Sequence, residues 1–201
     1  MRRFGIVWVL MLAASLAQAG EFNTVLNIGD AAPAWKKLPG VDGKEHSLDD
    51  LKEKKLVVVV FTCNSCPVAT DYEDRIIAFA KKYAEQVAVV AINVNRVPED
   101  SLPKMKARAE QKKFPFVYLF DQSQQIAKDY GATFTPEFFV LGPDRKIAYL
   151  GGMDDNSNAA QVKAKYLEPA VEAVLAGNKP ATPEAVARGC MIRYARERKA
   201  K

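Results

Sequence analysis

The chain has 201 residues, of which 49% are hydrophobic and 26% are charged, and this length fits one domain with short appendages. The composition excludes a disordered or low-complexity protein and supports a single hydrophobic core without a disulfide scaffold. The net charge of +5 is modest, and acidic residues are scattered among the basic ones, so the sequence gives no sign of nucleic-acid binding.

The first nineteen residues have the pattern of a secretory signal. Two arginines follow Met1, an almost unbroken apolar run covers residues 4–16, and Ala17-Gln18-Ala19 has the small-x-small form of a cleavage site. The apolar run is short for a membrane span, and no charged stop-transfer flank follows it. We therefore expect a signal peptide over 1–19, export to the periplasm or the extracellular space, and membrane contact only through the signal. A retained N-terminal membrane anchor and a hydrophobic helix of the domain are the alternatives.

From residue 20 onwards, apolar patterns predict alternating strands and helices. Residues 35–38 and 44–47 flank a Val41-Asp42-Gly43 turn and predict a hairpin. Residues 56–61 and 87–92 are apolar runs without alternation, which is typical of strands buried on both faces. Between these two strands, apolar side chains recur at helical spacing, which predicts a right-handed parallel crossover through an amphipathic helix. The apolar positions of this helix are Val68, Tyr72, Ile76, Phe79 and Tyr83.

The second half of the chain continues the alternation and ends in a tail. The expected helices cover 101–112, 122–130 and 158–176, and the expected strands cover 116–120, 137–141 and 146–150. A Gly-Pro-Asp turn joins the last two strands, so they should be antiparallel. After Gly177 the chain is rich in proline and then in basic residues, which predicts an extended basic tail over 177–201.

The strongest chemical motif is Cys63-Asn64-Ser65-Cys66-Pro67, which lies where the first buried strand ends and the amphipathic helix begins. Open α/β sheets place their sites at this edge, and the free N–H groups of a helix N-terminus favour an anion. The helix dipole is worth about 0.3–1 kcal/mol, and up to about 2 kcal/mol when partly buried, which lowers a thiol pKa by about one unit. We therefore expect Cys63, outside the helix, to be an exposed nucleophilic thiolate. Cys66, in the first turn, is expected to be the resolving thiol of a redox-active Cys63–Cys66 disulfide.

Other roles of a Cys-x-x-Cys pair are alternatives. Zinc needs about four ligands, and beyond the pair the chain has only His46 and Cys190. Attachment of a c-type haem would need a histidine in place of Pro67. A purely structural disulfide is also an alternative, although a ring of four residues constrains the unfolded chain little. We expect no metal site and no organic cofactor.

These residues make the chain similar to the thioredoxin-like redoxin family, the alkyl hydroperoxide reductase/thiol-specific antioxidant superfamily, and in particular to its exported members with a Cys-x-x-Cys motif. The resemblance covers roughly residues 28–175, and it is carried by Ile28–Pro33, by Phe61–Pro67 and by Thr135-Pro136. It implies an α/β thioredoxin-like fold over 20–176, with a central mixed β-sheet flanked by helices. An extra helix would be inserted between the Cys-x-x-Cys helix and a cis-proline loop at Pro136.

The resemblance also implies an exported thiol–disulfide oxidoreductase that uses the Cys63–Cys66 couple. Its partners would be protein thiol or disulfide substrates and an electron-donating or electron-accepting protein. The backbone of Thr135 would pair with an extended substrate chain beside Cys63. The residues expected to contact substrate flank the two cysteines or form the proline loop; they are Thr62, Asn64, Ser65, Pro67, Thr135 and Pro136.

Departures from the family pattern leave the redox direction open. Thr62 stands where thioredoxins usually have tryptophan, and Val57 stands where they have a buried aspartate. Glu137 is the nearest conspicuous carboxylate in sequence that could replace that aspartate in proton transfer. The Asn64-Ser65 pair matches neither the Gly-Pro of reductants nor the Pro-His of strong oxidants.

Two other functions within the same fold are alternatives. A thiol peroxidase working through Cys66 is disfavoured, because Cys63 and Val59 stand where peroxiredoxins have a hydroxyl residue and a proline. Slow oxidation of Cys63 by peroxide is still compatible with the sequence. A non-catalytic redoxin-fold module that holds a soft metal ion between the two cysteines, or docks a partner, is the other alternative.

Three features outside the main motif are weaker. Cys190 makes the number of cysteines odd; it would be a second resolving thiol if the tail folded back across the site, or a small apolar residue that anchors the tail. The run Asp154-Asp155-Asn156 lacks the ligand periodicity of a known calcium loop, so we expect a polar turn. His46, near the hairpin, is expected to be a surface residue.

Overall fold

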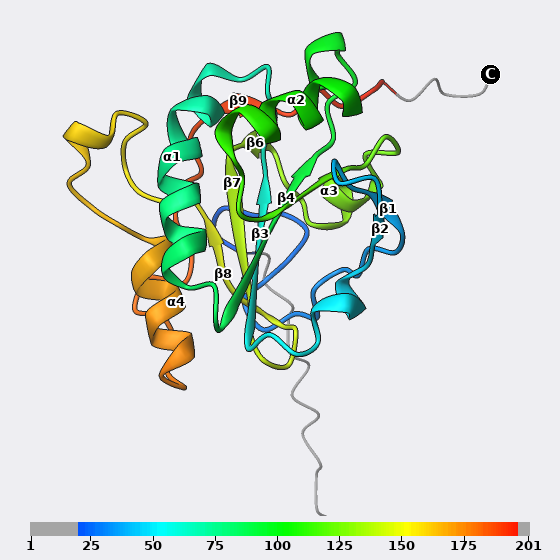
Figure 1. Cartoon of the computed structure of the whole chain (residues 1–201). Coiled ribbons are helices and arrows are strands. Elements are labelled where there is room, and N and C mark those ends of the chain that lie inside the picture. The colour runs from blue at the N-terminus through cyan, green and yellow to red at the C-terminus, as the bar shows by residue number, and fades with distance from the viewer. Residues whose placement is uncertain (1–19, 197–201) are drawn as a thin grey trace, which may run out of the picture.

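A five-stranded mixed sheet with the strand order β5-β4-β3-β7-β8 forms the centre of the molecule in the computed structural model, which describes residues 20–196 (Figure 1). The expected signal segment lies outside the described residues. The strands are β3 (Leu56–Phe61), β4 (Val87–Asn93), β5 (Val117–Phe120), β7 (Glu137–Leu141) and β8 (Ile147–Gly151). Strands β3, β4 and β5 are parallel, whereas β7 pairs antiparallel with both β3 and β8. This is the mixed sheet that the resemblance implies.

Both faces of the sheet are covered, which explains the continuous apolar runs. On one face, Val58 and Val60 of β3 lie in a core cluster with Tyr72 and Ile76 of helix α1 (Pro67–Lys82). On the other face, Val57 and Val59 belong to a cluster that includes Trp35 and Leu48 from the N-terminal part of the chain. Helices α2 (Leu102–Lys112) and α4 (Leu167–Leu175) lie on the α1 side, and α3 (Gln125–Asp129) lies on the other.

The remaining elements are short. They are β1 (Leu38–Pro39), β2 (Glu45–His46), β6 (Phe134–Thr135), β9 (Cys190–Met191) and the 3-10 helices η1 (Leu48–Leu51), η2 (Pro98–Asp100) and η3 (Ala159–Gln161). Strands β1 and β2 pair antiparallel, as the hairpin pattern predicts. Within residues 20–196, no helix is long and apolar enough to cross a membrane.

The helix expected over 158–176 is shorter in the structure. Only Leu167–Leu175 is α-helical, and a loop with one 3-10 turn replaces the first part. The Asp155 carboxylate holds this loop, because its Oδ1 accepts hydrogen bonds from the backbone N–H groups of Lys163 (2.9 Å) and Ala164 (3.1 Å). Pro169 therefore falls in the first turn of α4, where its missing N–H breaks no hydrogen bond.

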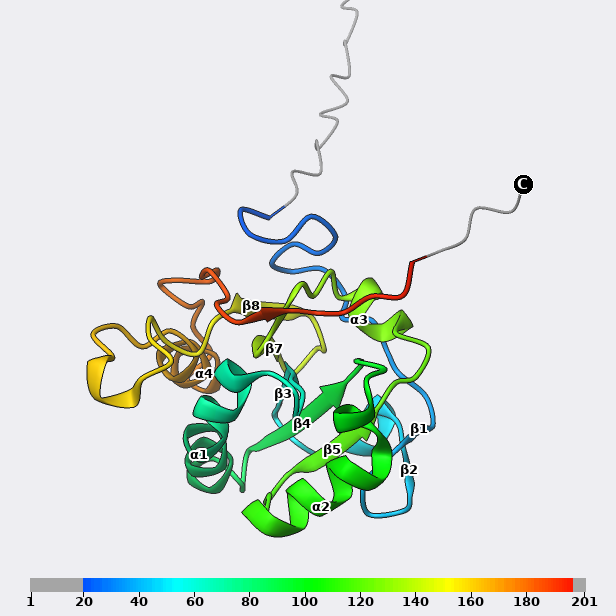
Figure 2. The same cartoon turned by 90° about the horizontal axis from the view of Figure 1, so that it is seen from above.

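The expected basic tail includes a segment that packs on the domain. Residues 183–195, which we call the strap, cross the end of the sheet where the parallel strands finish (Figure 2). Strand β9 of the strap pairs antiparallel with β6, with Thr135 opposite Cys190 and Phe134 opposite Met191. The strap therefore brings the C-terminal cysteine to the loop that contains Pro136.

Candidate active site

The Cys63–Pro67 loop joins the end of β3 to the start of α1. Cys66 is the N-cap residue of α1, and its Sγ accepts a hydrogen bond from the N–H of Ala69 at 3.3 Å. Pro67 follows at the first helical position, where a missing N–H costs nothing. The structure thus places the two cysteines at the helix N-terminus that the sequence predicts.

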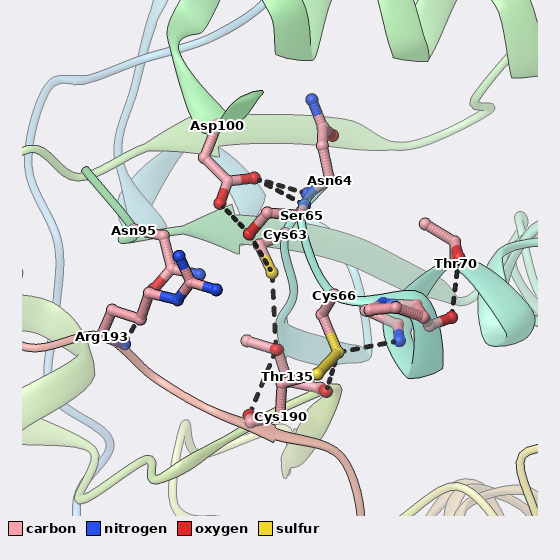
Figure 3. Close-up of a disulfide and its surroundings, with 12 residues drawn as sticks. Cys63, Asn64, Ser65, Cys66, Thr70, Asn95, Asp100, Thr135, Cys190 and Arg193 are labelled. Carbon is pink, nitrogen blue, oxygen red and sulfur yellow. Dashed lines mark hydrogen bonds between the residues drawn. A yellow bond between two sulfur atoms is a disulfide. The ribbon is translucent and has the colours of Figure 1, made fainter. Parts of the chain in front are cut away.

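Cys63 carries a free thiol, and it is buried rather than exposed as expected. Only 3% of the residue is accessible. Its Sγ lies 3.5 Å from Thr135 Oγ1 and 3.7 Å from Ser65 Oγ (Figure 3). The Thr135 loop and the Ser65 side chain therefore lie against the sulfur that we expect to be the nucleophile.

The disulfide in the structure joins Cys66 to Cys190, not to Cys63 as expected. The Cα atoms of the bonded residues are 5.9 Å apart, although 124 positions separate them in sequence. The physical reason is the pairing of β9 with β6, which sets Cys190 opposite Thr135. The backbone oxygen of Thr135 in turn lies 3.2 Å from Cys66 Sγ. The tail thus folds back across the site, as one interpretation of Cys190 anticipates.

Asp100, which the sequence did not single out, organises the loop between the cysteines. Its Oδ1 accepts hydrogen bonds from the backbone N–H groups of Asn64 (2.6 Å) and Ser65 (3.1 Å) and from the Asn93 side chain (3.2 Å). Its Oδ2 accepts a fourth from the Ser65 hydroxyl at 2.5 Å. Asp100 is completely buried, so these four donors replace water around its carboxylate. No local sequence signal marks it, because its partners Asn64 and Ser65 lie about 35 positions earlier.

The proline loop has the geometry that the resemblance implies. The Thr135–Pro136 peptide bond is cis, and Thr135 contacts both Cys63 and Cys66. Glu137, which was a candidate for proton transfer, instead supports this loop. Its Oε2 accepts hydrogen bonds from the N–H groups of Thr133 (2.7 Å) and Phe134 (2.9 Å).

The other residues expected to contact substrate lie around the cysteines with different exposure. Pro67 is exposed, whereas Thr62, Asn64 and Ser65 are half-buried. The Asn64 side chain is held in place, because its amide donates a hydrogen bond to the Glu99 backbone oxygen at 3.0 Å. The Tyr118 hydroxyl donates to Asn64 Oδ1 at 3.2 Å. The Asn64-Ser65 segment is therefore held rigidly from two sides.

The weaker sequence features have structural roles. Asp154 forms an ion pair with Arg75 and accepts a hydrogen bond from the Tyr72 hydroxyl at 2.9 Å, so the acidic run is a polar turn tied to α1. His46 lies 3.0 Å from the carboxylate of Asp42 in the exposed hairpin.

Burial raises the pKa of the Glu137 carboxyl above its ordinary value of 4.5. A raised pKa means that the folded state binds the proton more tightly, so the protonated form favours folding. The stabilisation is complete below about pH 4.5 and is lost as the pH rises through the folded pKa. We expect Glu137→Gln to be more stable than the parent protein at pH 7, because it removes a charge that burial disfavours. Its amide oxygen can still accept both hydrogen bonds. The advantage should shrink towards pH 4.

Urea unfolding at several pH values tests this expectation. The exposed Glu53 provides the matched control, since Glu53→Gln should leave the pH profile unchanged. A stability difference for Glu137→Gln that stays constant from pH 4 to pH 7 would contradict the assignment.

Comparison with known proteins places these features in a family. A model described as the AhpC/TSA family matches residues 28–150. The structure is similar to that of a hypothetical protein, SMc02350, from Sinorhizobium meliloti 1021, with 32% identity, a TM-score of 0.80, and coverage of 86% of this chain and 97% of that one. An uncharacterized conserved protein from Geobacillus kaustophilus gives 31% identity, a TM-score of 0.81, and coverage of 91% and 100%.

A third similar structure has a redox description. It is described as a thiol:disulfide interchange protein DsbE from Chlorobium tepidum, with 25% identity, a TM-score of 0.55, and coverage of 62% of this chain and 84% of that one. No curated protein matches the chain. The family match over residues 28–150 and the shared architecture lead to one conclusion: the chain belongs to the AhpC/TSA family of redoxins and has a thioredoxin-like fold.

Proposed function

We propose that this redoxin is an exported thiol–disulfide oxidoreductase that exchanges disulfides through Cys63 and Cys66. The observation that carries the proposal is the free Cys63 thiol beside the disulfide-bonded Cys66, at a helix N-terminus and against a cis-proline loop. Family membership and the similarity to a thiol:disulfide interchange protein support it. Export is proposed from the signal pattern of residues 1–19, and a mature N-terminus at Gly20 is the expected result of N-terminal sequencing.

The proposed reaction needs no organic cofactor, since sulfur atoms carry the electrons. The Cys63 thiolate attacks one sulfur of a substrate disulfide, which forms a mixed disulfide and releases the other substrate sulfur as a thiolate. The Cys66 sulfur is bonded to Cys190 in the structure, so a dithiol partner protein must first reduce that bond. The Cys66 thiolate then attacks Cys63 Sγ, forms the Cys63–Cys66 bond and releases the second substrate sulfur as a thiolate. The substrate gains two electrons. A dithiol partner protein then supplies two electrons to reduce the Cys63–Cys66 disulfide again. The same steps in reverse oxidise a substrate dithiol.

Trapping the mixed disulfide tests the proposal. In a Cys66→Ser, Cys190→Ser double variant, no second thiol can resolve a bond at Cys63. We expect this variant to form a stable adduct with a disulfide-containing peptide, which mass spectrometry locates at Cys63 and dithiothreitol releases. The matched control is the Cys63→Ser, Cys190→Ser double variant, in which Cys66 is the one cysteine left and no stable adduct is expected. Absence of an adduct at Cys63 would overturn the assignment of the nucleophile.

A thiol peroxidase is the second candidate, and the Thr135 hydroxyl 3.5 Å from Cys63 Sγ favours it, because a hydroxyl can orient a peroxide. Peroxide consumption that survives Cys66→Ser but not Cys63→Ser would support this candidate. Tight, stoichiometric binding of copper(I) or zinc without turnover would instead support a metal-holding module.

A further inference from the structure

The strap is held by hydrogen bonds on both sides of Cys190, through backbone groups before it and through buried side chains after it. At one end, the N–H of Ala185 donates to the Leu150 backbone oxygen at 3.1 Å. At the other end, the N–H of Arg193 donates to Asn95 Oδ1 at 3.0 Å, and the N–H of Ala195 donates to Gln124 Oε1 at 2.8 Å. Asn95 and Gln124 are 3% and 1% exposed, so the domain directs buried polar groups at the strap.

The middle of the strap lies where an incoming chain would pair. Strand β9 occupies the edge of β6, and a chain bound by strand addition would use this same edge. Gly189 permits the close approach, because a Cβ atom there would lie 2.0 Å from the Thr135 backbone oxygen. The strap thus occupies the edge of the proline loop that a substrate segment would use, although its cysteine is bonded to Cys66 rather than to Cys63.

The three cysteines differ in their access to solvent. Cys63 and Cys66 are 3% and 1% exposed, whereas Cys190 is half-buried. A cleft of about 240 Å³ lies next to the part of the strap that precedes Cys190, and it is lined by Val68 of α1, by Arg188 and Gly189 of the strap, and by residues 155–157. A thiol of another protein therefore meets Cys190 before it meets either member of the Cys-x-x-Cys pair.

We propose that Cys190 is a third redox-active cysteine and that the strap is an internal substrate of the Cys63–Cys66 pair. The inference rests on the proposed function. The Cys63 thiolate attacks Cys66 Sγ, the Cys63–Cys66 bond forms, and the Cys66–Cys190 bond breaks. The electron pair leaves on Cys190 Sγ, which takes up a proton from solvent, so no external oxidant or reductant is needed. The exchange removes the covalent tether, so that only hydrogen bonds, which an incoming chain can replace, then hold the strap at the Thr135 edge.

Thr135 connects the groups that react. Its hydroxyl lies 3.5 Å from Cys63 Sγ and 3.4 Å from the Cys190 backbone oxygen, and its own backbone oxygen lies 3.2 Å from Cys66 Sγ. Cys63, Cys66 and Cys190 also pack together in one small cluster with Val68 and Ala69. The attacking sulfur, the shared sulfur and the leaving strap are therefore gathered around one residue (Figure 3).

Disulfide mapping tests the exchange. The full-length mature protein, oxidised and then held at pH 8, is quenched with acid, alkylated and digested. The Cys66–Cys190 form carries the alkyl group on Cys63, and the Cys63–Cys66 form carries it on Cys190. We expect both forms in the parent protein. Their ratio should not depend on the potential of a thiol buffer, because both forms contain one disulfide.

Variants of the strap make the test specific. Gly189→Ala pushes the strap away from Thr135, so the Cys190-alkylated form should rise severalfold. Met191→Ser is the matched control on the same strand; its side chain is 72% exposed, and the ratio should stay at the parent value. Alkylation of Cys63 alone in the parent protein and in both variants would overturn the inference and leave the Cys66–Cys190 bond as a structural cross-link.

Cys190→Ser separates this inference from the proposed function. If that variant forms a Cys63–Cys66 disulfide and exchanges it with peptide thiols, the proposed function stands whatever the mapping of the parent protein shows. If it forms neither the disulfide nor an adduct, the proposed function itself is wrong.

Discussion

Replacing Cys63 with serine is expected to reduce disulfide exchange to the background rate of the buffer. The structure provides a chemical reason that is independent of stability. Cys63 is the thiol that attacks substrate in the proposed reaction, and the Cys63–Cys66 bond that completes the reaction cannot form without it. It is also the only free thiol among residues 20–196 in the structure, where Cys66 and Cys190 are bonded to each other. A serine hydroxyl of similar size keeps the contact with Thr135 but cannot act as a thiolate. The measurement is insulin reduction with a dithiol electron donor.

The Cys63→Ser variant should also keep its fold and its Cys66–Cys190 bond. Its melting temperature should match that of the parent protein, and its disulfide map should show the Cys66–Cys190 bond alone, because the Cys63–Cys66 form needs the Cys63 sulfur. Cys190→Ser is the informative comparison, since it also removes one sulfur but leaves the Cys63–Cys66 pair complete. Exchange activity that persists in Cys63→Ser would mean that Cys66 or Cys190 is the attacking thiol.

Asp100→Ala is expected to destabilise the protein by about 3 kcal/mol, which corresponds to about 6–12 °C in melting temperature for a domain of this size. The substitution removes an acceptor that serves four donors, two of them the backbone N–H groups of Asn64 and Ser65. Asp100 is completely buried, so water cannot replace the lost hydrogen bonds without the loop opening. Thermal unfolding followed by circular dichroism measures the effect.

Two further substitutions test whether the lost hydrogen bonds cause the lower stability of Asp100→Ala. Asp100→Asn keeps an oxygen that can accept from Asn64 and Ser65, so it should cost less than Asp100→Ala. Asp71→Ala removes an exposed carboxylate on α1 and should change stability by no more than about 0.5 kcal/mol. Equal melting temperatures for Asp100→Ala and Asp71→Ala would show that Asp100 does not hold the loop.

Local patterns were sufficient for most of the fold. The uninterrupted apolar run of β3 predicted a strand covered on both faces, and the spacing from Val68 to Tyr83 predicted the buried side of α1. The loop around Cys63 and Cys66 and the turn at Pro136 could also be placed, because a strand end, a helix start and an X-Pro bond are properties of a few consecutive residues. The helix expected from residue 158 failed, since the Asp155 carboxylate fixes a loop there.

The parts of the site that were missed depend on contacts between distant residues. Glu137 was the candidate carboxylate near the cysteines, because it is close in sequence to Pro136. The structure places Asp100 against the loop instead, and it uses Glu137 to hold residues 133 and 134. Likewise, the sequence suggested that Cys190 could return to the site, but only the pairing of β9 with β6 shows that it bonds with Cys66.

The positions of the three cysteines in the sequence bear on the order in which their disulfides can form. The groups that seat the strap, the side chains of Asn95 and Gln124 and the backbone oxygen of Leu150, all precede it in the sequence. If the protein is exported as proposed, a chain that emerges N-terminus first exposes Cys63 and Cys66 to an oxidising compartment before Cys190 arrives. Under that proposal the neighbouring pair is the first that can close, and the long-range Cys66–Cys190 bond would be the later product.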